Sequence, residues 1–203
     1  MYIPKHFRED DLETLHKLMQ EYSFAALITQ HESMPFATHL PFILDAQRGP
    51  YGTLLAHMAR ANPQWHDFND KQEVLVIFQG PHAYVSPSWY EVELSVPTWN
   101  YAAVHAYGIP RLLAGSEELY RLLKILIETH EAQFENPWPF QLPDDYLQKM
   151  MRGIVAFEIE ITRLEGKFKL SQNRTESERE NVIAALQEST QTQSVAELMS
   201  RKK

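Results

Sequence analysis

Three segments of this 203-residue sequence combine residue types that suit the binding of an anionic, aromatic ligand. The first is HMARANP, residues 57–63, where an expected strand gives way to a short helix. The N–H groups at a helix start and the planar guanidinium of Arg60 can together hold a phosphate, with His57 and Asn62 close by. A plainer interpretation fits the same residues: Asn62-Pro63 caps the helix, and Arg60 pairs with a surface carboxylate.

The second segment, GKFKLSQNR, lies towards the C-terminal end of the chain. In an extended backbone Lys167, Lys169 and Ser171 share one face, while Phe168 and Leu170 share the other. This alternation predicts a basic ridge on a strand anchored in the core, which suits a bound phosphate or carboxylate. The alternative is a solvated strand face whose charge balances neighbouring glutamates.

The third segment is aromatic and runs through GPHAYVSPSWY, residues 80–90, and VPTWNY, residues 96–101. Aromatic rings stack on planar ligands, and polar neighbours fix the orientation of such a ligand. The same composition is typical of a subunit interface. Both interpretations hold together if the ligand lies at that interface.

The composition narrows the class of protein. There are 19 Lys and Arg against 27 Asp and Glu, so the net charge of −8 disfavours a polyanion partner unless the basic residues gather on one face. Without cysteine, the chain has no disulfide, thiolate nucleophile or Cys-ligated metal. No metal site is predicted, because no HExxH motif or close histidine pair occurs. No apolar run could span a bilayer, and the polar start does not fit a secretory signal, so we expect a cytoplasmic protein.

The hydrophobic pattern predicts a mainly β chain with peripheral helices, in a single domain over residues 1–203. Strands are expected at 24–29, 35–44, 51–58, 74–78 (ended by Gly80-Pro81) and 154–164, with a separate basic strand after Gly166. Helices are expected from Asp10, from 63 to about 69, from 116 to about 131 with a leucine stripe that includes Leu123, at 144–151, and in a helical tail at about 175–203. Because no βαβ alternation is present, an antiparallel barrel is favoured over a doubly wound sheet.

Together these motifs resemble the PaiB-like family of FMN-binding negative transcriptional regulators. The resemblance rests on residues 57–63, 80–90 and 96–108, on KFKLSQNR, and on the opening MYIP. It implies an antiparallel split β-barrel, shared with pyridoxamine-phosphate oxidases and flavin reductases, and a homodimer with FMN in a groove between subunits. One departure is EVELS, residues 91–95, where two glutamates weaken any anion site beside Trp89.

The resemblance also implies where the cofactor binds. The strand that ends at residues 57–62 would contact the phosphate, the basic strand would approach the groove, and Trp99 and Asn100 would line the ring. The full set of expected cofactor-binding residues is His57, Arg60, Asn62, Thr98, Trp99, Asn100, Lys167, Lys169, Ser171 and Asn173.

Three functions stay open from the sequence. The first is an FMN-dependent redox or flavin-carrier protein, which would take hydride from a nicotinamide cofactor if it turns over; no side chain is assigned as acid or base. The second is a negative transcriptional regulator that acts through a partner or directly on DNA. Direct binding would use Lys167, Lys169, Arg174, Arg179 and the tail 201–203. The third and weakest is a haem-binding split barrel, because no histidine stands out as an axial ligand.

Overall fold

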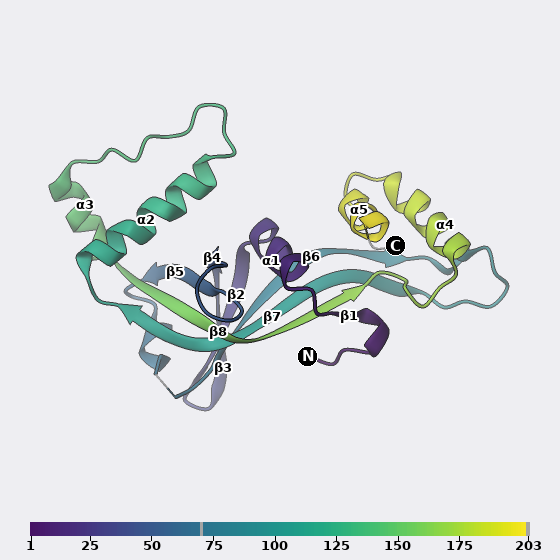
Figure 1. Cartoon of the computed structure of the whole chain (residues 1–203), viewed down its shortest axis with the longest axis horizontal. Helices are drawn as coiled ribbons and strands as arrows, with labels where there is room; N and C mark the ends of the chain where they lie inside the picture. The colour runs from purple at the N-terminus through teal and green to yellow at the C-terminus, as the bar shows by residue number, and fades with distance from the viewer. Residues whose placement is uncertain (70, 202–203) are drawn as a thin grey trace. The chain divides into compact units, whose positions relative to one another are not determined.

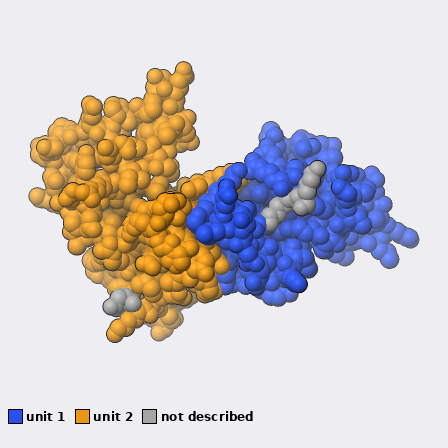
Figure 2. All heavy atoms as spheres, viewed as in Figure 1, with its two compact units in different colours: residues 1–18, 78–105, 165–203 blue, residues 19–77, 106–164 orange. Residues whose placement is uncertain are grey.

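The computed structural model describes residues 1–69 and 71–201, and the chain forms two compact units (Figures 1 and 2). Unit 1 comprises residues 1–18, 78–105 and the chain from 165 onward, and unit 2 comprises residues 19–77 and 106–164. Three strands pass from one unit into the other: β6 (Val74–Val85), β7 (Thr98–Leu113) and β8 (Ile154–Lys169).

Within the described ranges, eight strands form one sheet in the order β3-β2-β6-β7-β8-β5-β4, with β1 paired to β8. The remaining strands are β1 (Arg8–Glu9), β2 (Phe24–His31), β3 (Met34–Pro41), β4 (Ile43–Asp45) and β5 (Thr53–Ala59). Strand pairs such as β2–β3 and β5–β8 are antiparallel. The end strands β3 and β4 are not paired with each other, so the sheet is not closed into a full barrel. The predicted antiparallel, mainly β architecture is confirmed.

Helices lie at each predicted place, together with two short helices, at residues 5–7 and 87–90, that were not predicted. They are η1 (Lys5–Phe7), α1 (Leu12–Glu21), η2 (Pro63–Asp67), η3 (Pro87–Tyr90), α2 (Ser116–Glu131), α3 (Asp144–Met151), α4 (Glu176–Gln187) and α5 (Gln193–Arg201). Helices α4 and α5 form the expected helical tail in unit 1, and the capping box at Thr175 opens α4. None of the helices in the described ranges has the length and apolar character needed to cross a membrane.

The expectation that Gly80-Pro81 ends a strand is wrong. β6 continues through both residues to Val85. Gly80 lies where a Cβ atom would come within 3.1 Å of the Ala102 carbonyl oxygen, so the glycine permits a close approach of the backbone of β7. A glycine inside a strand often marks such an approach instead of a break.

The expected separation of a basic strand after Gly166 is also wrong, because β8 runs unbroken from Ile154 to Lys169. A Cβ atom on Gly166 would lie 2.7 Å from the Glu9 carbonyl oxygen. The glycine therefore lets β1 pair closely with β8, where Glu9 and Gly166 are partners.

In unit 2, the central part of β8 is buried on both faces. Val155, Phe157 and Ile159 are buried as the alternation predicts, but Ala156 and Glu158 are buried as well. The second face is covered by α2, whose Leu122 and Leu126 pack with Leu55 and Ala156. The leucine stripe is thus confirmed for those two residues, whereas Leu123 is only half-buried.

The carboxylate of Glu158 is stabilised by two arginines. Arg48 donates to one oxygen at 2.7 Å and Arg111 donates to the other at 2.8 Å. Burial acts to raise the pKa of Glu158, but these hydrogen bonds outweigh it and hold the pKa below its ordinary value. The Glu158 carboxylate therefore stays ionised although it is buried.

A histidine–aspartate pair in unit 2 makes the folded state pH-dependent. His31 Nδ1 lies 2.7 Å from Asp67 Oδ1, and the Thr29 hydroxyl donates to the other oxygen of Asp67. The hydrogen bond and the charge of Asp67 raise the pKa of His31 above 6.5. Stabilisation by this pair should be complete below the unfolded-state pKa and should be lost as pH rises through the folded-state pKa.

Thermal unfolding of His31→Gln checks this expectation. At about pH 5.5 the variant should unfold at a lower temperature than the parent protein, and by about pH 8.5 the difference should shrink. His39→Gln is the matched control, because His39 is exposed on the neighbouring strand β3. An equal difference at both pH values would contradict the assigned role of the pair.

Candidate functional site

Unit 1 contains a pocket of about 200 Å³ that we call the Lys169 pocket. Five of the ten predicted cofactor-binding residues line it: Thr98, Asn100, Lys169, Ser171 and Asn173. The other lining residues are His6, Phe7, Tyr90, Val96 and Arg174. The structure therefore brings together the start of β7 and the end of β8, which are about 70 residues apart in sequence.

Lys169 is the central cation of this pocket. Its neighbours Phe168 and Leu170 are buried, as the alternation predicts, and they fix the end of β8 in the core of unit 1. The ammonium group donates to the Thr98 hydroxyl and, at 2.6 Å, to the Trp99 carbonyl oxygen. An ammonium has three N–H donors, so one remains for a ligand.

The electrostatic state of Lys169 suits an anionic ligand. Burial lowers the pKa of its amine below the ordinary value, and the nearby charge of Lys167 lowers it further. A partly desolvated cation next to a like charge gains more from a bound anion than a fully hydrated lysine does. The pocket is thus electrostatically prepared for a phosphate or carboxylate.

A buried amide holds the far side of the pocket. Asn100 is completely buried, donates to the Ser171 hydroxyl at 2.9 Å and accepts from it at 3.2 Å. The same amide donates to the sulfur of Met199 on α5. Ser171 has a φ of 62°, in the left-handed region, so the Asn100 contact stabilises an uncommon backbone conformation. Asn100 and Ser171 therefore shape the pocket wall.

Arg174 is the second cation of the pocket, and the sequence reasoning did not assign it to the cofactor site. Its guanidinium lies 4.0 Å from the Tyr90 ring centroid, donates to the Ser95 hydroxyl at 2.9 Å and contacts Glu178 at 3.2 Å. The sequence held one signal for assigning Arg174 to the site: Arg174 follows Asn173 directly in the basic motif GKFKLSQNR.

Two predicted residues of unit 1 lie on a neighbouring aromatic surface and do not line the pocket. Lys167 Nζ lies 5.4 Å from the ring centroid of Tyr101. Trp99 is 53% exposed, and its ring lies 6.0 Å from Tyr84 and 6.1 Å from His82, centroid to centroid. The strand alternation places the Trp99 ring on the opposite side of β7 from Thr98 and Asn100.

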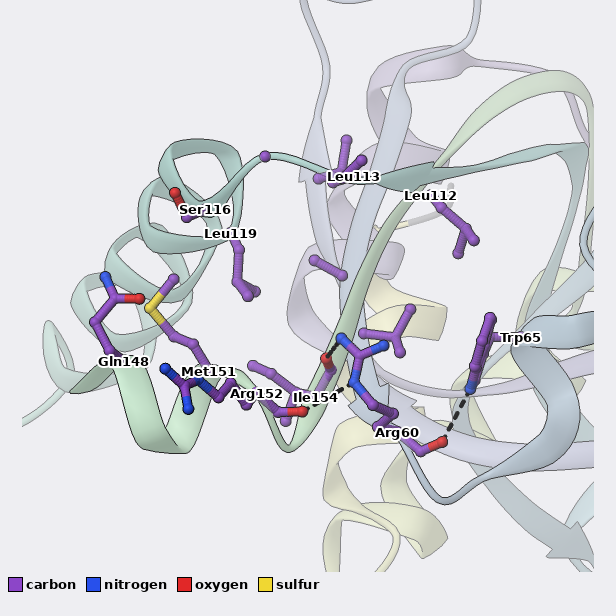
Figure 3. Close-up of a pocket in the computed structure, with 14 residues that line it drawn as sticks. Arg60, Trp65, Leu112, Leu113, Ser116, Leu119, Gln148, Met151, Arg152 and Ile154 are labelled. Carbon is purple, nitrogen blue, oxygen red and sulfur yellow. Dashed lines mark hydrogen bonds between the residues drawn. The ribbon is translucent and has the colours of Figure 1, made fainter. Parts of the chain in front are cut away.

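The remaining predicted residues belong to unit 2: His57 lies on β5, and Arg60 and Asn62 lie at the corner that follows it. Asn62 caps η2, because its side-chain oxygen accepts from Gln64 N at 3.0 Å, and its amide donates to the Thr38 hydroxyl at 2.9 Å. Arg60 Nε and Nη2 each donate at 2.9 Å to a backbone oxygen, that of Arg152 and that of Ile154 (Figure 3). The helix-cap interpretation is confirmed for Asn62. Arg60 donates to backbone oxygens, and among the described residues it pairs with no surface carboxylate, so that part of the interpretation is wrong.

Arg60 also lines a second pocket, of about 360 Å³, that we call the Arg60 pocket. It lies in unit 2. Its lining, drawn in Figure 3, consists of Arg60, Trp65, Leu112, Leu113, Ala114, Gly115, Ser116, Leu119, Gln148, Met151, Arg152, Ile154, Val155 and Ala156.

His57 is not among the described residues that line either pocket. It is half-buried on β5, and its Nδ1 has no hydrogen-bond partner among the described residues. Burial lowers the pKa of this imidazole, so His57 is neutral near pH 7.

Comparison with known proteins decides the family. The family model described as "Putative FMN-binding domain" matches residues 1–163. The chain belongs to this family. It is also 42% identical to "Protease synthase and sporulation protein PAI 2" of Bacillus subtilis, over 100% of this chain and 98% of that protein. An uncharacterized protein of Emericella nidulans is 32% identical and covers 92% of this chain and 90% of its own length. The predicted membership in the PaiB-like family is confirmed.

Solved structures agree on the fold. The FAD- and haem-binding protein of Mycobacterium smegmatis has a TM-score of 0.62 at 15% identity, over 88% of this chain and 80% of that one. The flavocytochrome Anf3 of Azotobacter vinelandii has a TM-score of 0.60 at 14% identity, over 86% and 73%. The predicted split-barrel architecture is confirmed, and the chain is a PaiB-type member of the flavin-binding split barrels.

Proposed function

We propose that this protein binds FMN as a homodimer in the cytoplasm, and that the phosphate of FMN occupies the Lys169 pocket. The observation that carries the proposal is the convergence of five predicted residues on one small pocket with two cations. A phosphate takes charge-assisted hydrogen bonds from Lys and Arg and further bonds from amides and hydroxyls. Lys169, Arg174 and the exposed amide of Asn173 supply this donor set.

The roles of the chain's own residues follow from their contacts. Thr98 and the Trp99 carbonyl hold the Lys169 ammonium in place, and Asn100 fixes Ser171 beside it. When bound, FMN would supply electron or hydride transfer, with a nicotinamide cofactor as the reductant in a redox role. His57, Arg60 and Asn62 stay predicted cofactor contacts, but the hydrogen bonds of Arg60 and Asn62 favour a structural role for that corner.

Dimer formation is supported by the exposed aromatic side chains of unit 1. Tyr2 is 83% exposed, Trp99 is 53% exposed and Tyr84 is also exposed. Large aromatic side chains are enriched at subunit interfaces, where a partner covers them. Sedimentation should therefore give a dimer, and a stable monomer at micromolar concentration would contradict this part of the proposal.

Direct DNA binding gains no support from Arg174 and Arg179, two of the basic residues proposed for it. Arg174 contacts Ser95 and Glu178, and Arg179 donates to the Met199 carbonyl. The exposed residues of α4 and α5 include several glutamates, which repel a phosphate backbone. Lys202 and Lys203 lie outside the described residues. A regulatory role would therefore act through the flavin or a protein partner.

The absorption spectrum of freshly purified protein tests the proposed cofactor. Flavin gives bands at about 370 and 450 nm, whereas a Soret band would indicate the haem alternative. If the protein is purified empty, titration with FMN and with haemin makes the same distinction. We expect saturable FMN binding with weaker binding of riboflavin, which lacks the phosphate. Equal affinity for the two flavins would exclude a phosphate-binding pocket.

A further inference from the structure

The walls of the Arg60 pocket are mostly apolar. They come from three stretches of the chain: Arg60 and Trp65 after β5, residues 112–119 from the end of β7 into α2, and residues 148–156 from the end of α3 into β8. Leu112, Leu119, Met151 and Val155 are among the residues that supply them. In the view of Figure 3, Leu119 and Met151 lie on the helical side, Trp65 lies on the other side, and Arg60 lies between them. Such a wall favours the hydrocarbon part of a ligand.

The charge of the lining is positive. It contains Arg60 and Arg152 but no Asp or Glu among the described residues, in a chain whose net charge is −8. Arg60 is held by two backbone oxygens through Nε and Nη2, so its Nη1 donors remain for a ligand. No carboxylate within the described ranges pairs with either guanidinium, whereas Arg121 of the same unit pairs with Glu117.

A fixed arginine, Arg60, in a pocket whose lining also includes the exposed Arg152 suits a carboxylate. A guanidinium presents parallel N–H donors that match the two oxygens of a carboxylate. Arg60 already has its orientation set by the chain, so binding requires little further ordering of its side chain. The apolar walls favour a ligand with a hydrocarbon part over a bare inorganic anion.

We propose that the Arg60 pocket binds a second ligand, an amphipathic small-molecule carboxylate. The carboxylate pairs with Arg60 and Arg152, and the hydrocarbon part packs against Leu112, Leu119 and Met151. This ligand is distinct from FMN, and its site lies in unit 2, whereas the Lys169 pocket lies in unit 1.

Calorimetric titration with octanoate tests the proposal on the full-length protein. Octanoate should bind with a stoichiometry of one per chain. Acetate, which lacks the hydrocarbon tail, and octanol, which lacks the charge, should each bind at least about 10-fold more weakly, because each removes one of the two kinds of contact. The same samples are assayed for FMN by absorbance, so failure of this proposal is distinguishable from failure of FMN binding.

Two variants locate the site. Arg152→Gln should weaken octanoate binding by about 10-fold or more, because a charge-assisted bond is lost. Ala114→Trp should abolish it by filling the pocket from an exposed position on the connection before α2. Lys149→Gln on α3 is the matched control, since Lys149 is exposed and does not line the pocket, and it should bind octanoate like the parent protein.

Three results would overturn the proposal. The first is no saturable octanoate binding at millimolar concentration, and the second is octanol binding as tight as that of octanoate. The third is competition between FMN and octanoate together with weakened FMN binding in Arg152→Gln, which would make this pocket part of the flavin site.

Discussion

Replacing Lys169 with methionine should weaken FMN binding by about 10- to 150-fold. A charge-assisted hydrogen bond contributes about 1.5–3 kcal/mol, and each 1.4 kcal/mol corresponds to a tenfold change in affinity. Methionine keeps an unbranched side chain while removing the ammonium that the Thr98 hydroxyl and the Trp99 carbonyl fix in place. Fluorescence titration of FMN measures the loss.

Riboflavin is the internal control for this experiment. Because it lacks the phosphate, its affinity should be nearly the same in Lys169→Met and in the parent protein. Lys124→Met on the exposed face of α2 is the matched variant, and it should bind both flavins normally. Equal losses for FMN and riboflavin would show that Lys169 acts on the ring or on folding, and no loss would exclude it from the site.

The variant Arg60→Gln tests whether the FMN phosphate is bound by the Lys169 pocket alone or also by Arg60. The sequence makes both Arg60 and Lys169 candidate phosphate contacts, whereas the structure shows the Arg60 guanidinium bonded to the backbone oxygens of Arg152 and Ile154. If the Lys169 pocket holds the phosphate alone, FMN affinity changes little in Arg60→Gln. A loss of FMN affinity as large as that of Lys169→Met would instead indicate that Arg60 and Lys169 both contact the FMN phosphate.

Strand alternation correctly predicted which side chains around Phe168 are buried, whereas the assignment of the neighbouring residues to a cofactor site stays a prediction. The alternation of charged and apolar residues around Phe168 places Lys169 at the surface of a buried strand, and the structure agrees. What the alternation could not give is the pairing of Lys169 with Thr98, because contacts between strands that are distant in sequence depend on sheet order and register. For the same reason the role of Arg174 beside Tyr90 was missed.

Glycine and proline misled the prediction of strand ends. Gly80-Pro81 and Gly166 carry the usual signals for a turn, yet both sites lie inside long strands. The deciding factor is the backbone of another element: a Cβ atom on Gly166 would lie 2.7 Å from the Glu9 carbonyl oxygen, and one on Gly80 would be crowded by the Ala102 carbonyl oxygen at 3.1 Å. Sequence alone cannot distinguish a glycine that ends a strand from one that admits a neighbour.

The burial of the second face of β8 was also not predicted from the sequence. Polar residues such as Glu158 alternate with apolar ones, which predicts a half-buried strand. The structure covers that face with α2 and neutralises Glu158 with Arg48 and Arg111. The stability of unit 2 therefore depends on leucines of α2 that the sequence could place on a helix face but could not match to a partner.

Leu126→Ala should accordingly destabilise the protein by about 2–5 kcal/mol, because it removes a buried side chain from the contact with Leu55 and Ala156. In a chain of this size, each kcal/mol lowers the melting temperature by about 2–4 °C, so a fall of roughly 4–20 °C is expected. Leu123→Ala makes the same chemical change at a half-buried position of the same helix and should cost clearly less. Thermal and urea unfolding measure both variants. Similar losses for the two would mean that α2 presents a different face to the sheet, and a negligible loss for Leu126→Ala would mean that this helix does not stabilise the second face of β8.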